Sequence, residues 1–586
     1  AAREKYKVAI NSIPVADIFW EQYHEWRLVR AFDARPFLKA GENEISVEIF
    51  PFENEEAHFI ASLDIPEYGK ILTGEDWEGA SVVKGTLRSL DCGDEFICRT
   101  ETASPAFEKS FVIKSEVAQA TLHITGVGFY EASLNGSKIG DKVLDPSPTD
   151  FSKRVLYSTY LLDKDLVVGE NKLKVLVGHG WYDQRSISAW NFDAAHWRNF
   201  PRMIAQLEVV YADGTREMIL SDSSWLHVAS PVGYDCIREG EIIGARDLRG
   251  PDLEKTPLQA CEVEGPAGVL TSEAQPAAKI VREIKPAAIY HAGPKTWIVD
   301  FGENFAGWAR IRLRGLRKGE LVSFTYDERI APGELPAKEY DWHEHNSLWK
   351  QFPGEPIRNI DRYFVTSASY HVLKDGAAFQ RDRLIASGSR DDLYEPRFTF
   401  NGFQYVVIRG LANRPLEEDI VGCVISTDFP KTGNFESSDE VLNKLVLFTE
   451  RSYRSNYVDG FPMDCPHREK NGWTGDAQLA SRLAQYLFDN TAGYEKWVFY
   501  IPDSQRASGE IPGIVPTANW GFVWGNGPGY DFALPVIMWR LYLHKGDRRI
   551  LDRLYEPLKR LVDYTARERM RDDNLVDWGI PDWIPA

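Results

Sequence analysis

Apolar side chains in roughly the first four hundred residues recur mostly at every second position, between short turns that contain Gly and Asn. Residues 45–49 alternate in this way directly after the turn 41–43, and a similar phrase returns where 169–171 precedes 173–177. Period-two alternation bounded by such turns is typical of β-strands. The repeated phrase indicates two related β-sandwiches in tandem, and a chance match of one turn is the alternative.

Further strand signals extend this β-rich region to about residue 436. Asn135-Gly136 follows an alternating run and predicts a hairpin turn. Residues 262–290 are rich in Pro, Ala, Glu and Gly and are expected to form a loose linker. An irregular, charged insertion is expected at about 332–392, before the last strands of a sandwich.

The hydrophobic period changes at Ser437, where Ser437-Ser438-Asp439-Glu440 is interpreted as a capping box. The pattern from there on predicts helices at 439–456, 475–488, about 491–501, 531–544 and 548–570. Strands followed by helices favour separate domains. The predicted domains are an N-terminal β-sandwich (1–104), a second β-sandwich (105–230), a third with the insertion (231–436) and a helical domain (437–586).

Composition and charge narrow the classes of partner. The chain has 586 residues, 43% of them hydrophobic and 26% charged, as in ordinary globular proteins. Its net charge of −19 argues against nucleic acid or an anionic membrane as a partner. No apolar run is long enough to cross a bilayer, and the N-terminus lacks an apolar signal core. We therefore expect a cytoplasmic protein, or a periplasmic or secreted one if a signal peptide has been removed.

The six cysteines are expected to be unpaired thiols, since they are few in so long a chain. No Cys or His spacing suggests a metal site, and neither a metal nor a cofactor is predicted. Cys465 lies in a chemically rich stretch and raises the alternative of a thiol-dependent enzyme. A structural thiol is the favoured interpretation, because no partner base is identifiable in the sequence.

The stretch 464–476 concentrates the candidate chemistry of the chain. It reads Asp-Cys-Pro-His-Arg-Glu-Lys-Asn-Gly-Trp-Thr-Gly-Asp, with three carboxylates beside His, Arg and Trp. Pro466 and two glycines predict a loop that feeds a helix, with Thr474 as a candidate N-cap and Asp476 in the first turn. Burial beside a Trp raises the pKa of a carboxyl group and a neighbouring Arg lowers it, so spacing alone leaves a salt-bridged surface loop as an alternative.

This stretch resembles the signature of the bacterial α-L-rhamnosidases of glycoside hydrolase family 78, in the shorter of its two forms. The resemblance implies that Glu469 is the general acid and that the rhamnose is held by Asp464, Arg468, Trp473 and Asp476. It also implies galactose-binding-like jelly rolls before an (α/α)6 barrel, and single-displacement inversion with rhamnose-containing glycosides as substrates. Residues 128–136, 144–157, 178–182, 238–246 and 394–405 resemble the β-domains of the same family.

The second carboxylate that inversion needs is not identified in this chain. In the family it is a Glu from a later loop, and no match to it is found before residue 586. Twelve helices with their connections need on the order of 200 residues, whereas 149 remain after Ser437. We therefore expect an incomplete barrel, from a fragment or one completed by another chain. A natural half-barrel would expose an apolar surface and associate, for example as a homodimer.

Other residues of the helical region are candidate sugar contacts. Asp531 is interpreted as a hydroxyl-binding group, and Trp520, Trp524 and Trp583 as walls for the apolar face of the sugar, with core packing as their alternative. Rival functions are a non-catalytic carbohydrate-binding protein and a glycosidase of similar barrel acting on another sugar.

Overall fold

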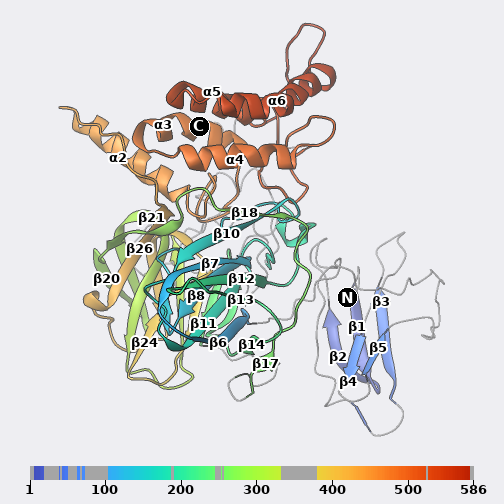
Figure 1. The fold of residues 1–586 in the computed structure, drawn as a ribbon, viewed down its shortest axis with the longest axis vertical. Coiled ribbons are helices and arrows are strands. Elements are labelled where there is room, and N and C mark those ends of the chain that lie inside the picture. Colours follow the sequence, from blue (N-terminus) through green and yellow to red (C-terminus); the bar gives the residue numbers. More distant parts are fainter. Residues whose placement is uncertain are drawn as a thin grey trace. The chain divides into compact units, whose positions relative to one another are not determined.

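The computed structural model describes residues 5–18, 38–39, 43–50, 62–65, 69–72, 103–185, 190–244, 253, 256–330, 379–522 and 525–580. The chain divides into two units, 1–102 and 103–586. In the first unit, one antiparallel sheet has the order β2-β1-β3 and a second pair of strands forms a hairpin (Figure 1). These strands are β1 (Lys5–Ile10), β2 (Ile13–Ile18), β3 (Ile45–Phe50), β4 (Ser62–Ile65) and β5 (Gly69–Leu72). The strand expected at 45–49 is therefore present as β3.

The second unit begins with a β-sandwich. Its five-stranded sheet has the order β13-β12-β7-β10-β18, and its six-stranded sheet has the order β17-β14-β6-β11-β8-β9. Buried apolar residues of both sheets, among them Leu122, Leu173 and Val209, form one core between them. The strands are β6 (Ala106–Ile113), β7 (Val117–Val127), β8 (Phe129–Leu134), β9 (Ser137–Lys138), β10 (Arg154–Leu161), β11 (Gly169–Gly178), β12 (Arg202–Tyr211), β13 (Arg216–Leu220), β14 (Leu226–Val228), β17 (Leu258–Gln259) and β18 (Val269–Ser272).

The predicted hairpin turn at Asn135-Gly136 joins β8 to β9. Both residues have positive φ angles, 53° and 84°, which a type I′ turn requires and which Asn and Gly tolerate best. The side chain of Asn135 accepts a hydrogen bond from the Lys172 amide at 2.9 Å and so fastens the turn to β11.

A large, mostly antiparallel sheet follows, in the order β15-β16-β23-β22-β25-β21-β26-β19, with β20 and β24 also paired to β21. Its strands are β15 (Val232–Cys236), β16 (Gly240–Ile243), β19 (Ala278–Ile284), β20 (Ala288–Gly293), β21 (Thr296–Arg314), β22 (Leu321–Asp327), β23 (Arg381–Ile385), β24 (Asp391–Tyr394), β25 (Asn401–Arg409) and β26 (Ile420–Thr427). Two short 3-10 helices, η3 (Phe192–Ala194) and η4 (Glu417–Asp419), lie in connections. A core that includes Phe324, Tyr394 and Phe403 packs on this sheet.

Two expectations for this region need correction. The stretch 262–290, expected to be a linker, contains β18, β19 and the start of β20, and β18 pairs in parallel with β10. The insertion expected at about 332–392 falls largely outside the described residues, but its last part contains β23. In β23 the buried positions are Asp382 and Leu384, so charged residues obscured a period-two pattern.

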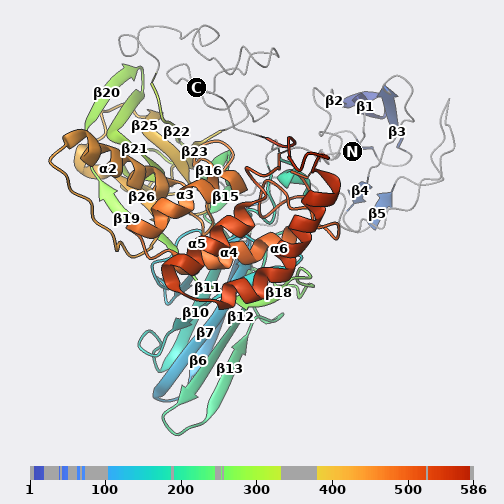
Figure 2. The same cartoon turned by 90° about the horizontal axis from the view of Figure 1, so that it is seen from above.

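The helical region contains the five predicted helices, confirmed to within a few residues. They are α2 (Glu440–Ser455), α3 (Thr474–Leu487), α4 (Thr491–Ser504), α5 (Ala533–Lys545) and α6 (Arg549–Glu568). Helix α5 contacts α3, α4 and α6 (Figure 2), and these four helices lie together at one end of the β-region (Figure 1). No helix among the described residues is long and apolar enough to cross a membrane.

Both predicted caps are wrong in detail. The N-cap of α2 is Asp439, whose carboxylate accepts from the amides of Val441 and Leu442. Ser437 instead accepts from the Asp439 amide, so the box is not formed as expected. Thr474 is the first helical residue of α3, and its hydroxyl donates to the Gly513 carbonyl at 3.1 Å. The Thr474 side chain, which the spacing predicted to cap the helix, makes this tertiary hydrogen bond instead.

One hydrophobic core joins the β-region to the helices. It contains Phe129 and Trp181 of the sandwich that begins the second unit, Phe398 and Phe400 next to β25, and Tyr494 and Trp497 of α4. The loop between α2 and α3 carries the candidate motif. The β-region and the helices around this loop share one hydrophobic core.

Candidate active site

Glu469 lies at the centre of the motif loop and is buried, with 4% of its surface exposed. Its Oε2 atom accepts two hydrogen bonds from indole N–H groups, at 2.7 Å from Trp473 and at 2.6 Å from Trp190. Trp473 belongs to the motif, whereas Trp190 comes from the loop between β11 and β12, 279 positions earlier. Both N–H groups donate to the same oxygen, so the two indoles help to fix the carboxyl group in place.

The main chain around Glu469 is held by two buried cations. Arg238 donates from Nη2 to the Glu469 carbonyl at 2.6 Å and to Asn471 Oδ1 at 3.2 Å. Lys470 has a positive φ of 57°, and its ammonium donates to the carbonyls of Ile237, at 2.8 Å, and of Phe400. The general-acid candidate is thus held on both sides by residues of the β-region.

Burial acts strongly on Lys470. Desolvation, with the charge of Arg238 nearby, lowers the pKa of Lys470 to about 7. The two carbonyl acceptors satisfy the ammonium without neutralising it, because neither carries a formal charge.

Two further carboxylates of the motif surround Glu469. Burial, and then the negative charge of Glu469, raise the pKa of Asp464 well above its ordinary value. Asp476 is an exposed residue, yet the protein atoms around its carboxylate desolvate it, and with Glu469 they raise its pKa to about 6. Burial and the nearby negative charge thus favour the protonated forms of Asp464 and Asp476.

Asp464 also shapes the loop. Its Oδ1 atom accepts the Asn471 amide at 2.9 Å, and its Oδ2 atom accepts the Cys465 thiol at 2.9 Å. Burial and the Asp464 carboxylate raise the pKa of Cys465 well above its ordinary value. A thiol held in its protonated form is a poor nucleophile, which favours the structural interpretation of Cys465 over a thiol-dependent enzyme.

Arg468 carries the positive charge of the motif. Burial works against that charge, but Cys465, Glu469 and Asp464 raise the pKa of Arg468 above its ordinary value. The guanidinium is therefore permanently charged beside the acids, as a group that orients a polar substrate requires.

Aromatic rings gather beside the Glu469 carboxylate. The ring of Trp190 lies 5.4 Å from Trp473 at an angle of 89°, and 4.0 Å from Trp520. Trp473 also packs edge-on to Tyr530 at 5.5 Å. Aromatic faces suit the apolar faces of sugars, and their edges and N–H groups suit hydroxyls.

The remaining predicted sugar contacts have different outcomes. Asp531 is buried next to Tyr530, and burial, with the negative charge of Glu510, raises its pKa to about 7. Its role in sugar binding stays a prediction. Trp524 and Trp583 lie outside the described residues. Asp464, Arg468, Trp473 and Asp476 all lie in one loop and helix start with Glu469, as predicted from their spacing.

Sequence reasoning missed Trp190 and Arg238 as partners of Glu469. Neither shows a spacing signal, because each approaches the motif loop only through tertiary packing across more than two hundred residues. The resemblance of residues 238–246 to a family segment was the only signal, and it marked Arg238 without giving it a role. His179, Trp181 and Tyr182 lie in the family-like stretch 178–182 and are 1%, 3% and 2% exposed, which indicates that they pack in the core and do not face a sugar.

The described residues contain no group of three or more His, Cys, Asp or Glu side chains that could hold a metal ion. Four cysteines are described and free, namely Cys236, Cys261, Cys423 and Cys465. The other two lie outside the described residues.

Comparison with known proteins decides the family. A model of the bacterial α-L-rhamnosidase N-terminal domain matches residues 115–282, one of the concanavalin-like domain matches 290–426, and one of the six-hairpin glycosidase domain matches 430–586. The chain belongs to the bacterial α-L-rhamnosidases of glycoside hydrolase family 78. The resemblance stated from the motif is thereby confirmed.

Individual relatives agree with this assignment. An α-L-rhamnosidase of Formosa agariphila is 29% identical over 513 residues, which cover 82% of this chain and 49% of that protein. One of Streptomyces avermitilis is 29% identical over 455 residues, covering 74% and 39%. This chain thus spans about half the length, or less, of these curated GH78 relatives.

Solved structures show the same architecture. The α-L-rhamnosidase of Dictyoglumus thermophilum has a TM-score of 0.68 and 25% identity, over 99% of this chain and 62% of that one. The Streptomyces avermitilis α-L-rhamnosidase, solved in complex with L-rhamnose, has a TM-score of 0.73 and 24% identity, over 97% and 54%. Both confirm β-domains followed by a helical glycosidase region, of which the described residues of this chain form the five helices α2–α6.

Proposed function

We propose that the protein containing this chain is an inverting α-L-rhamnosidase in which Glu469 is the general acid. The observation that carries the proposal is the Glu469 carboxyl group, which is buried, fixed by two indoles and flanked by Asp464 and Asp476. Membership of GH78 supports rhamnosides as the substrate class, and a family relative has been solved with L-rhamnose bound.

Helices α2–α6 are proposed to be the first part of an (α/α)6 barrel with Glu469 near its mouth. The second carboxyl group, which would activate water on the opposite face of the sugar, is proposed to lie in a part of the protein outside this chain. An inverting pair stands about 6.5–9.5 Å apart, which leaves room for that water. The half-length coverage of relatives is consistent with such a division.

In this mechanism Asp464, Arg468 and Asp476 bind sugar hydroxyls, and Trp473 packs against the ring. Glu469 protonates the glycosidic oxygen as the bond to the anomeric carbon breaks. Water attacks that carbon from the other face and gives up a proton to the second carboxylate. The products are β-L-rhamnose and the free alcohol.

The test is Glu469→Gln in the full natural protein, assayed by release of phenol from phenyl α-L-rhamnoside. We expect kcat to fall by roughly 100-fold or more, because the amide cannot donate the proton. The matched control is Glu556→Gln, which makes the same change at an exposed position of α6. Near-normal turnover by Glu469→Gln, with unchanged thermal unfolding, would remove Glu469 from the role of acid. Rhamnose binding without hydrolysis by the wild type would favour a carbohydrate-binding protein instead.

A further inference from the structure

Trp190, in the sandwich formed by β6–β14, β17 and β18, reaches the Glu469 carboxyl group. It lies in the loop between β11 and β12, directly before η3, and 7% of its surface is exposed. Its Nε1 atom is 2.6 Å from Glu469 Oε2. Its ring packs against both Trp473 and Trp520, so its orientation is set by two aromatic neighbours.

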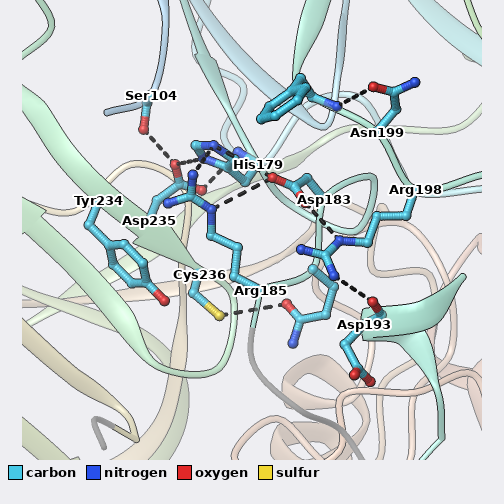
Figure 3. A network of polar contacts seen from close by, with 12 residues as sticks. Ser104, His179, Asp183, Arg185, Asp193, Arg198, Asn199, Tyr234, Asp235 and Cys236 are labelled. Atoms are coloured by element: carbon cyan, nitrogen blue, oxygen red, sulfur yellow. Dashed lines mark hydrogen bonds and ion pairs between the residues drawn. The ribbon is translucent and has the colours of Figure 1, made fainter. Parts of the chain in front are cut away.

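The loop that carries Trp190 is braced by buried charges on its two flanks. On the side that leads in, His179 Nδ1 lies 2.7 Å from Asp235 Oδ1, and Arg185 Nη2 lies 2.6 Å from His179 Nε2 (Figure 3). On the side that leads out, Arg198 Nε donates to Asp183 Oδ1 at 2.8 Å, and its Nη1 atom donates to the Asp193 carbonyl (Figure 3). A side chain held by such a network loses little entropy when it orients a catalytic group.

The loop is also fastened to the helical region. Trp181 Nε1 donates to Asp459 Oδ2 at 2.9 Å, and the Trp181 ring packs edge-on to Phe192 at 5.1 Å. Trp190 is therefore supported from the sandwich and from the segment that precedes the motif.

The two indoles act on the same oxygen of Glu469. A carboxylate oxygen has two acceptor sites, and the N–H groups of Trp190 and Trp473 use both sites of Oε2. No hydrogen bond from a described residue reaches Oε1. The proton of the acid form is therefore directed to Oε1, because an oxygen that already accepts two N–H groups is a poor site for a further hydrogen.

We propose that Trp190 is a positioning residue for the general acid: with Trp473 it anchors Oε2 of Glu469, so that Oε1 carries the proton toward the leaving-group oxygen. The β-sandwich that carries Trp190 thereby takes part in the chemistry of the helical region. This inference rests on the proposed role of Glu469.

The test uses two substrates that differ in their need for acid catalysis. Phenyl α-L-rhamnoside has a basic leaving group that must be protonated, whereas the 2,4-dinitrophenyl glycoside releases a stable anion without a proton. In the full natural protein, Trp190→Phe should lower kcat for the phenyl glycoside by roughly 10- to 100-fold, as for loss of one charge-assisted hydrogen bond, and leave the dinitrophenyl glycoside within about threefold. A purely structural role would slow both substrates alike.

A matched control and a second variant sharpen the result. Trp297→Phe removes an indole N–H that donates to the Leu411 carbonyl in the large sheet, and it should change neither rate. Replacing Trp190 by β-(3-benzothienyl)alanine keeps the ring shape and removes only the N–H group. It should reproduce the selective loss even if Trp190→Phe fails to fold.

Glu469→Gln, measured on the same two substrates, separates the two hypotheses. If it spares both substrates, the assignment of the acid fails and the positioning role fails with it. If it shows the selective loss while both Trp190 variants keep normal rates, or slow both substrates equally, only the positioning role of Trp190 is overturned.

Discussion

The guanidinium of Arg238 donates a hydrogen bond to the main-chain carbonyl of Glu469 at 2.6 Å, across 231 positions of sequence. Arg238 is 1% exposed, and its guanidinium also lies 4.9 Å from the centre of the Trp181 ring. This hydrogen bond holds the main chain at Glu469, and it therefore fixes the point from which the Glu469 side chain extends. The relationship makes the geometry of the helical region depend on the β-region.

Arg238→Met tests this dependence. The change leaves the Glu469 carbonyl and Asn471 Oδ1 without the donor they share, at a cost of about 1–3 kcal/mol in the free energy of unfolding. We also expect kcat to fall, because the loop loses an anchor. Urea denaturation and rhamnoside hydrolysis measure the two effects. Arg548→Met, at a side chain that is 79% exposed, is the control. Wild-type values for both quantities would contradict the role of Arg238.

Lys470 predicts a pH dependence of stability. Burial lowers its pKa from 10.5 to about 7 in the folded protein, so between these values the unfolded chain binds more protons. The free energy of unfolding should therefore rise with pH across this window, by at most about 1.4 kcal/mol per pH unit from this group. Below pH 7 the group is protonated in both states and contributes no slope.

Comparison of Lys470→Met with the wild type isolates this contribution. The difference in the free energy of unfolding between pH 7 and pH 9.5 should be smaller in the variant, as measured by denaturant titration at each pH. Lys559→Met, at an exposed position of α6, should follow the wild type. Parallel curves for Lys470→Met and the wild type would show that Lys470 titrates as it does in water.

Gly472 predicts a steric requirement behind the motif. A Cβ at this position would lie 2.0 Å from the Val515 carbonyl oxygen, and the Gly472 carbonyl accepts the Val515 amide at 2.9 Å. Gly472→Ala must therefore displace backbone, and we expect a loss of about 1–3 kcal/mol in the free energy of unfolding. Gly265→Ala meets no atom within 4 Å and is the control. Equal urea midpoints for the two variants would refute the close approach.

The sequence predicted the elements that local pattern determines. The helices at 439–456 and 475–488, the Asn135-Gly136 turn and the motif loop depend on spacing and turn chemistry over a few residues, and they lie where expected. The prediction that Thr474 caps α3 failed because its hydroxyl donates to the Gly513 carbonyl. β23 escaped because its buried Asp382 accepts a hydrogen bond from Tyr394 at 2.5 Å, a tertiary partner that no local pattern displays.

The candidate site followed the same division. Its motif residues are neighbours in sequence, so their proximity was predictable. The partners that hold Glu469, namely Trp190 and Arg238, come from other parts of the chain, and packing alone brings them together.

The hydrogen bonds from Lys470 to the carbonyls of Ile237 and Phe400 have a consequence for how the gene can change. These acceptors are backbone atoms, so point mutation of either residue leaves the carbonyl in place, whereas an insertion or deletion beside it moves the anchor. Recombination between related genes that exchanged only the helical segment would place Lys470 against Ile237 and Phe400 carbonyls that are spaced differently. We therefore expect functional chimeras to be those in which Ile237, Phe400 and Lys470 all come from the same parent.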